Sequence, residues 1–395
     1  MGRNLRTIDW NVTTMGRNLR TIDWNVPTMG RNLRTIDWNV TTMGRNLRTI
    51  DWNSPFWLFQ YLDVNYDFVS FEDRINFVLL GIQVIYYPLL AAIGVSVNLL
   101  TIVILSRGKC GLSKCVTRYL VAMAAADLLV VIFDLILRQI PIVYRGQFRF
   151  LWSIPVCNIH AVLLFAATDC SVWFTVTFTF DRFVAICCQK LKTKYCTERT
   201  AAVVLGTVSV LGCLKNIFWY FMFTEWYVLY NEPWFCYVTA SVMDSPMWAT
   251  IEFLHYILTP GIPFVLILLL NAFTVRYILV ASRARRRLRG HSRAESPRDP
   301  EMESRRKSII LLFVISGNFI LFWALFMVYF IWNRVWMLGF YSVILPRFIQ
   351  ELGFMFQLMS CCTNTCIYAV TQSKFREQLK NAVKYPFTVI IKFMK

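Results

Sequence analysis

Residues 309–332 read IILLFVISGNFILFWALFMVYFIW, an apolar stretch that carries no charged side chain and lies between Lys307 and Arg334. A helix rises about 1.5 Å per residue, so this stretch is long enough to cross the roughly 30 Å hydrocarbon core of a bilayer. Six further stretches meet the same requirement, and the predicted spans are 77–105, 118–142, 154–187, 200–222, 247–281, 306–332 and 342–371. The sequence therefore predicts an all-α membrane protein, a bundle of seven transmembrane helices.

The composition and the charge pattern agree with a membrane protein. Of the 395 residues, 57% are hydrophobic and the mean hydropathy is +0.49, which is more apolar than a soluble core can hide. The net charge of +18 does not indicate a nucleic-acid partner, because Lys and Arg cluster between the apolar runs. By the positive-inside rule, we expect a multi-pass membrane protein with an extracellular N-terminus and a cytoplasmic C-terminus. The basic connections are 106–118, 188–199, 282–307 and the tail 372–395, which together hold 24 Lys and Arg against four in the other three connections.

The chain before the first span is repetitive. Residues 1–53 contain four near-identical copies of a 14-residue unit, MGRNLRTIDWNVTT. The unit has too few apolar residues to stack into a core, so we expect a disordered extracellular tail followed by a pre-helix segment at 54–76. The tail contains no stretch apolar enough for a cleavable signal peptide, so the first span is expected to direct insertion. Asn11 and Asn39 lie in glycosylation sequons, and whether these are used stays open.

Only two of the twelve cysteines fall on the predicted outer face, Cys157 and Cys236. A disulfide between them would tie the outer end of the third span to the loop after the fourth and contribute about 2–5 kcal/mol. The alternative is a pair of free surface thiols.

Several polar residues fall within apolar spans at similar depth. Asp127 lies in the second span, Asn98 in the first, Ser171 in the third and Asn364 in the seventh. An ionisable group there costs about 2.5–3.5 kcal/mol, which makes it a functional hypothesis. A carboxylate with hydroxyl and amide oxygens suits a sodium ion or a proton. The alternative is a hydrogen-bonded packing cluster, and no other cofactor is expected.

The inner end of the third span carries Asp181-Arg182-Phe183. The adjacent acid is able to hold the arginine until backbone carbonyls of a partner compete for it. Taken alone, this triplet is also typical of an ordinary ion pair at a membrane end.

Taken together, these motifs resemble those of class A (rhodopsin-like) G-protein-coupled receptors over roughly residues 76–385. More loosely, the set is similar to the orphan subgroup that responds to aromatic amino acids and small peptides. Residues 373–376 resemble the start of a short amphipathic eighth helix within the tail 372–395. The motifs are Asn98, Asp127 after two alanines, Cys157, Asp181-Arg182-Phe183, the 319–323 segment with Phe319 and Trp323, and the 364–368 segment with Asn364 and Tyr368.

The chain departs from the family pattern at several positions. Phe183 replaces the usual Tyr, Thr365 replaces the Pro of the seventh span, and Leu325 replaces the Pro of the sixth. Losing the Pro in the sixth span removes a backbone kink. Arg305 replaces a frequently acidic residue, so we expect no ionic latch between that position and Arg182.

The resemblance implies a ligand cavity among the outer halves of the spans. Leu164 stands where amine receptors carry an Asp, which argues against a biogenic amine. Arg138 or Arg347 is expected to hold a ligand carboxylate while Glu252 or His255 takes an amine or amide. The alternative is that Asp134/Arg138 and Arg347/Glu351 pair within their own helices. Lys215 is expected to extend to the lipid headgroups. The candidate ligand contacts are Arg138, His160, Phe165, Asp169, Glu252, His255, Phe326, Phe330, Arg347, Glu351 and Phe354.

The resemblance also implies a function. An extracellular small molecule or peptide would activate a heterotrimeric G protein through the inner ends of the third, fifth and sixth spans. The basic run 283–289 would contact the G protein or anionic lipid, and Ser292, Ser296, Ser304 and Ser308 are candidates for phosphorylation. The alternatives are a non-signalling partner of another receptor and a transporter. Three scattered histidines without metal-ligand spacing argue against an enzyme.

Overall fold

The computed structural model describes residues 70–144, 154–222, 227–228, 237–238, 246–289, 300–339, 343 and 345–393. The predicted tail 1–53, with the sequons at Asn11 and Asn39, and residues 54–69 lie outside this part of the chain. Glycosylation at either sequon therefore stays a prediction.

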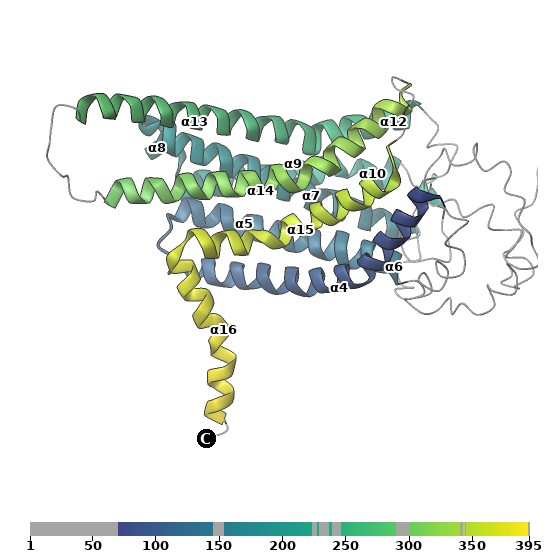
Figure 1. Cartoon of the computed structure of the whole chain (residues 1–395), viewed down its shortest axis with the longest axis horizontal. Helices are drawn as coiled ribbons and strands as arrows, with labels where there is room; N and C mark the ends of the chain where they lie inside the picture. Colours follow the sequence, from purple (N-terminus) through teal and green to yellow (C-terminus); the bar gives the residue numbers. More distant parts are fainter. Residues whose placement is uncertain are drawn as a thin grey trace, which may run out of the picture.

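Seven long helical segments of the described chain lie side by side along the long axis of the molecule, which confirms the predicted seven-helix bundle (Figure 1). Two of them contain short π-helical stretches, and the fourth ends in a separate short helix. In order, they are α4 (Phe71–Ser106); α5 (Lys114–Val130) with η5 (Val131–Gln139) and α6 (Ile140–Val143); α7 (Ile154–Cys187); α9 (Glu198–Asn216) with α10 (Phe218–Met222); α12 (Pro246–Tyr256) with η8 (Ile257–Gly261) and α13 (Ile262–Arg289); α14 (Pro300–Met337); and α15 (Arg347–Thr371).

Three short elements were not predicted, a helix and the two strands of a hairpin. α8 (Gln189–Tyr195) lies between the third and fourth spans. β1 (Tyr227–Val228) and β2 (Tyr237–Val238) pair antiparallel between the fourth and fifth spans, so the elements of the described chain are helical except for this small hairpin.

Polar side chains fix where three of the spans begin. Each accepts a hydrogen bond from the backbone N–H three residues later, which satisfies one of the otherwise unpaired amides of the first turn. The first two helices accordingly begin at 71 and 114, earlier than the predicted 77 and 118. The capping pairs are Ser70 with Asp73 at 3.2 Å, Ser113 with Val116 at 3.3 Å and Thr197 with Thr200 at 3.1 Å.

Within the described ranges, six helices are apolar and long enough to cross a membrane by length and composition alone. α15 is the seventh member of the bundle, and its sequence is more polar because its inward face carries side chains such as Gln357, Ser360 and Asn364. All three are buried in the bundle, where protein and not lipid surrounds them. A polar helix of this kind is compatible with a membrane because its neighbours supply the hydrogen bonds.

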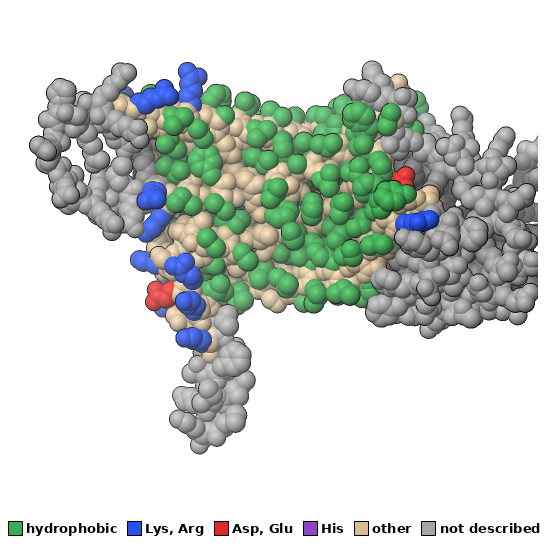
Figure 2. Space-filling model, in the orientation of Figure 1, with side chains coloured by type: hydrophobic (Ala, Val, Ile, Leu, Met, Phe, Trp, Pro, Cys, Tyr) green, Lys and Arg blue, Asp and Glu red, His purple; other side chains and the backbone are tan. Residues whose placement is uncertain are grey.

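The surface shows where the hydrocarbon lies. Hydrophobic side chains cover the middle of the bundle, whereas Lys and Arg gather at the end from which α16 (Ser373–Phe393) leaves (Figure 2). On α9, for example, Val203, Val210 and Leu214 are each about 60% exposed, at 61%, 58% and 60%. Such exposure of large aliphatic side chains is expected of a lipid-facing helix.

The two missing prolines leave their helices unbroken. α14 continues through Leu325 as one uninterrupted helix of 38 residues. In α15 the hydroxyl of Thr365 lies 2.7 Å from that of Thr101 on α4 and 3.1 Å from the carbonyl of Val97. The residue that replaces the proline therefore joins the first and seventh spans.

The predicted eighth helix is present as α16, which leaves the bundle at a steep angle and runs for 21 residues, longer than the short helix expected (Figure 1). Its first turn is anchored by Phe375, which is fully buried and packs edge-on against Tyr368 at a ring distance of 5.8 Å.

Candidate functional site

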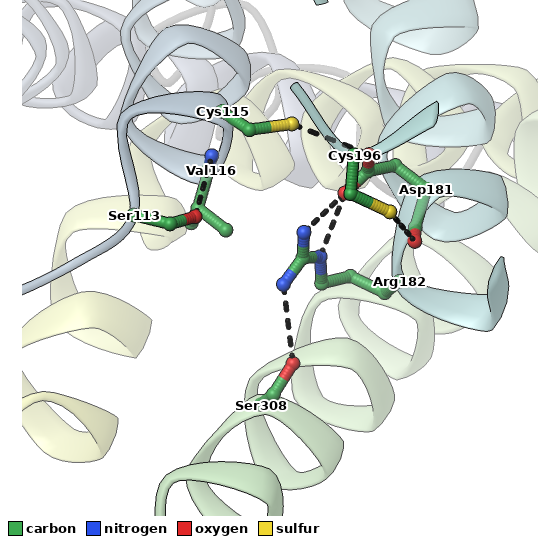
Figure 3. Close-up of polar contacts among 7 residues, drawn as sticks. All are labelled: Ser113, Cys115, Val116, Asp181, Arg182, Cys196 and Ser308. Carbon is green, nitrogen blue, oxygen red and sulfur yellow. Dashed lines mark hydrogen bonds and ion pairs between the residues drawn. The ribbon is translucent and has the colours of Figure 1, made fainter. Parts of the chain in front are cut away.

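The end of the bundle from which α16 leaves, called the inner end below, holds a cluster around Asp181 and Arg182 of α7 (Figure 3), and the opposite end is called the outer end. Arg182 donates to Asp181 through Nε at 3.0 Å and also through Nη2. Its remaining nitrogen, Nη1, points to the hydroxyl of Ser308 on α14 at 3.4 Å. Both members of the ion pair are buried, at 6% and 8% exposure. The cluster thus links the third and sixth spans through a neutral contact.

Two cysteines hold Asp181 from other elements. The thiol of Cys115 on α5 donates to the carboxylate at 3.3 Å, and the thiol of Cys196, after α8, donates to the backbone carbonyl at 3.5 Å (Figure 3). Burial, with the nearby Asp181 carboxylate, raises the pKa of the Cys196 thiol to about 11, so this group is protonated and able to donate at neutral pH. Sequence reasoning did not include either cysteine, because a thiol hydrogen bond has no sequence pattern. Phe183 is half-buried beside the pair.

The mid-membrane residues come together as a hydrogen-bonded cluster. Asp127 accepts from the hydroxyl of Ser171 at 2.6 Å through one oxygen and from the amide of Asn364 at 2.6 Å through the other. Asn98 does not contact the carboxylate; its amide donates to the carbonyls of Gly94 at 2.9 Å and Cys361 at 3.0 Å. The cluster joins the second, third and seventh spans, with Asn98 tying the first span to the seventh beside it.

An aromatic group fills the bundle above this cluster. Trp323 stacks on Phe319 at 5.5 Å, meets Phe326 edge-on at 5.6 Å, and donates its indole N–H to Ser360 of α15 at 3.1 Å. Phe326 in turn packs on Phe330 at 4.4 Å. The predicted residues Phe319 and Trp323 therefore link the sixth and seventh spans below the outer half of the bundle.

The outer half contains carboxylate–arginine pairs around an aromatic floor. Arg138 pairs with Asp134 at 3.0 Å and lies over the ring of Phe354 at 4.6 Å. Arg347 lies 3.6 Å from Glu351, which also accepts from Gln83 at 2.9 Å. Both predicted helix pairs are therefore formed, so each arginine has a partner before any ligand arrives.

A third pair was missed by the sequence analysis. Arg334 of α14 lies 2.7 Å from Glu252 of α12, and both side chains are buried. Arg334 also lies 5.9 Å from the ring of Tyr256, which stacks on Phe330 at 4.7 Å. Residue 334 was assigned to a loop because the sixth span was predicted to end at 332, whereas α14 continues to Met337. Glu252 is thus held by an arginine of another helix.

Two histidines occupy different environments. The ring of His160 lies with Nε2 at 2.7 Å from the carbonyl of Phe133, so this candidate ligand contact is engaged by the second span. His255 is packed edge-on against Phe165 at 4.9 Å and Trp219 at 5.5 Å. Its Nδ1 is buried without a hydrogen-bond partner among the described residues.

The prediction that Lys215 extends to the headgroups is wrong. Its ammonium lies 2.8 Å from Asp169 of α7 and 3.2 Å from the hydroxyl of Thr259, and its side chain is only 25% exposed. Asn216 donates to the same carboxylate at 2.6 Å. Asp169, predicted as a ligand contact, therefore serves to pair the third span with the fourth.

This ion pair also reaches the irregular part of the fifth span. Thr259, next to Pro260, has φ and ψ of −151° and 111°, outside the helical region. Its hydroxyl accepts from Lys215 and, at 3.1 Å, from the indole N–H of Trp173. The two contacts hold the break in the helix against the third and fourth spans.

We expect Lys215→Met to destabilise the protein by about 3–5 kcal/mol, because it leaves the Asp169 carboxylate buried without its cation. Thermal unfolding of the purified protein in detergent is the measurement. The double variant Lys215→Met/Asp169→Leu, which removes both charges, should recover most of the loss. A Lys215→Met protein as stable as the wild type would show that the Lys215–Asp169 pair does not contribute to stability in this way.

The outer end of α7 contains Cys157, which is disulfide-bonded and fully buried. Its predicted partner Cys236 lies outside the described residues, so the pairing stays a prediction. The ten other cysteines in the described part of the chain are not in disulfides.

Comparison with known proteins identifies the family of this chain. Residues 97–368 match the family described as 7 transmembrane receptor (rhodopsin family). The FMRFamide receptor of Drosophila melanogaster is 24% identical over 233 residues, which cover 55% of this chain and 40% of that receptor. The C-C chemokine receptor type 1 of Macaca fascicularis is 24% identical over 305 residues, 74% of this chain and 77% of that receptor. The aligned region thus spans less than half the length of the FMRFamide receptor.

The family match covers more than half of the chain and includes the residues of the inner cluster, the Asp127 cluster and the aromatic group. It confirms the resemblance drawn from the motifs. The chain is a multi-pass membrane protein, and it belongs to the rhodopsin family of seven-transmembrane receptors.

Proposed function

We propose that this receptor lies in the plasma membrane with its N-terminus outside, binds an extracellular small molecule or peptide, and activates a heterotrimeric G protein. The observation that carries the proposal is the position of Arg182, which is buried and has each of its three guanidinium nitrogens hydrogen-bonded to Asp181 or Ser308. The basic end of the bundle, from which α16 leaves, is then the cytoplasmic side (Figure 2).

The inner contacts supply a mechanism for switching. Arg182 reaches α14 through the 3.4 Å approach of Ser308, which is long for a hydrogen bond and involves no charge on the serine. An outward movement of the inner end of α14 breaks this contact first. The guanidinium is then available to backbone carbonyls of a G protein, as its charge-assisted donors require an acceptor.

Variants of the inner cluster test this mechanism in nucleotide exchange on purified heterotrimeric G proteins. Asp181→Asn should raise ligand-free exchange several-fold, because a neutral amide holds the guanidinium less strongly. Adding Arg182→Ala to Asp181→Asn should return exchange to the level without receptor. Arg118→Ala, which removes an exposed partner of Glu198 at the same end, is the control and should change little.

Normal exchange by Asp181→Asn/Arg182→Ala would refute the proposed role of Arg182. Absence of exchange with every variant, together with co-purification of another receptor, would favour a non-signalling partner instead.

The residues of the outer half favour a peptide-like ligand that carries both a positive and a negative charge. Arg138 and the Arg334/Glu252 pair flank one aromatic floor formed by Tyr256, Phe330 and Phe354. A ligand that bound only one member of a buried pair would leave the other charge uncompensated, at a cost of several kcal/mol. A ligand that carries a cation and an anion replaces both members at once. One relative is named for FMRFamide and another for C-C chemokines, which agrees with a peptide or protein ligand.

We therefore expect responses to peptides that carry both charges, measured with a G-protein reporter over a panel of short peptides and their singly blocked forms. Blocking either charge should reduce potency about tenfold or more, since charged hydrogen bonds contribute roughly 1.5–3 kcal/mol. The charge-reversed receptor Glu252→Arg/Arg334→Glu keeps a pair and should lose the response while it still reaches the surface. An unchanged response from the reversed receptor would exclude this pair from the ligand site.

We also propose that Asp127 binds a sodium ion. The residues fit such an ion in type, since the carboxylate and the Ser171 hydroxyl are oxygen donors and the buried Oδ1 of Asn98 has no hydrogen-bond partner in the described part of the chain. Sodium should raise the unfolding temperature of the wild type relative to an equal concentration of choline. Asp127→Asn should remove this difference, and a difference that persists in the variant would place the ion elsewhere.

A further inference from the structure

Ser308 stands at a position where a single added group would change the inner cluster. Its hydroxyl lies 3.4 Å from Nη1 of Arg182, its side chain is half-buried, and it follows Arg305-Arg306-Lys307 in the chain. The neighbouring Arg306 is exposed. A serine with three basic residues before it therefore touches the arginine on which the proposed switching depends.

We propose that Ser308 is a phosphorylation site and that its phosphate pairs with Arg182 to hold α14 against α7. The regulatory consequence rests on the proposed G-protein coupling, whereas the modification and the ion pair do not. A phosphoserine carries about −1.5 to −2 charges at pH 7 and three strong acceptor oxygens, so it would turn a long neutral contact into a charge-assisted one.

The orientation of the guanidinium favours this pairing. Nε and Nη2 of Arg182 both donate to the same carboxylate oxygen of Asp181, whereas Nη1 of Arg182 faces Ser308 (Figure 3). A phosphate on Ser308 therefore meets the one nitrogen that Asp181 does not occupy. Asp181 keeps its bonds, and the positive charge is shared between two anions, one on α7 and one on α14.

The basic residues before Ser308 define the class of modifying enzyme. An ATP-dependent serine/threonine kinase with an acidic substrate groove would select Arg305-Arg306-Lys307 by charge. In the transfer, the Ser308 hydroxyl oxygen forms a bond to the γ-phosphorus of ATP, the bond from that phosphorus to the leaving ADP oxygen breaks, and the hydroxyl proton passes to a base of the kinase.

Burial of Ser308 makes the modification dependent on the state of the bundle. With α14 against α7, the hydroxyl is half-covered and faces Arg182. When the inner end of α14 moves away, the hydroxyl becomes accessible. Phosphorylation thus acts on the open form, and the new ion pair returns the bundle to the closed form. Phosphorylated Ser308 would thus supply on α14 the negative charge that the chain lacks at position 305, where Arg305 replaces a frequently acidic residue.

The test uses the full-length receptor in lipid nanodiscs, treated with ATP and a kinase selective for basic sites. Peptide mapping by mass spectrometry should find phosphate on Ser308 and none there in Ser308→Ala. Ser304→Ala removes a serine one turn earlier in the same helix and should leave the Ser308 phosphate in place. Failure to find phosphate on Ser308, after this treatment and in receptor isolated from cells with phosphatases inhibited, would overturn the modification.

The ion pair is measured without any G protein. Phosphorylation should raise the unfolding temperature of the wild type by about 2 °C or more, and the rise should be absent from Arg182→Met. A second comparison needs no change at Arg182: Ser308→Glu should unfold at a higher temperature than its neutral match Ser308→Gln, and high salt should reduce the difference. An equal rise in Arg182→Met, or no difference between the Glu and Gln variants, would overturn the pairing.

Ligand-free nucleotide exchange completes the test. The phosphorylated receptor should catalyse exchange about tenfold more slowly than the unmodified one, because one added charged hydrogen bond corresponds to roughly that factor. Loss of all exchange from the unmodified receptor contradicts the proposed coupling and leaves the mass and unfolding results intact. An unchanged exchange rate with Ser308 phosphorylated and stabilised would overturn the regulatory role.

Discussion

Charged side chains within a hydrocarbon layer require partners inside the protein, and the arrangement of this bundle follows from that requirement. In the described part of the chain, buried pairs or clusters centred on Asp181, Asp127, Asp169 and Glu252 satisfy it. Three of them join different helices directly, and the fourth, at Asp181, reaches α5 through Cys115 and α14 through Arg182 and Ser308. Because lipid offers no competing hydrogen bonds, these polar contacts fix which faces of the helices meet, and the apolar side chains fill the space between them.

The sequence was informative where a residue's depth in its span determines its surroundings. Asn98, Asp127, Ser171 and Asn364 were expected to meet because they lie at similar depth in four spans. Ser171 and Asn364 bond to Asp127, whereas Asn98 bonds to backbone carbonyls of the first and seventh spans instead. The pairs within one helix, such as Asp134 with Arg138, were expected as an alternative because a spacing of four residues places both on one face.

Rotation and length of the helices could not be predicted in the same way. Lys215 was assigned to lipid because apolarity alone does not say which face of the fourth span meets the third. Arg334 was missed because an apolar window ends where charged residues begin, although the helix itself continues to Met337. In both cases the basic group is directed inward to a carboxylate of another helix, a relationship that hydropathy cannot report. The contacts of Cys115 and Cys196 to Asp181 likewise depend on tertiary packing.

The loss of the proline at Leu325 gives these pairs a common mechanical link. Arg334 and Ser308 lie on the same unbroken α14, about 39 Å apart along a helix that rises about 1.5 Å per residue. A kinked helix would absorb part of a displacement at its bend, whereas a continuous one transmits it as a tilt. In the proposed switching, release of Arg334 from Glu252 at the outer end and of Ser308 from Arg182 at the inner end would be two consequences of one movement of α14. The aromatic stack at Phe319 and Trp323, between those ends, is the point about which α14 would pivot against α15, since Trp323 is bonded there to Ser360.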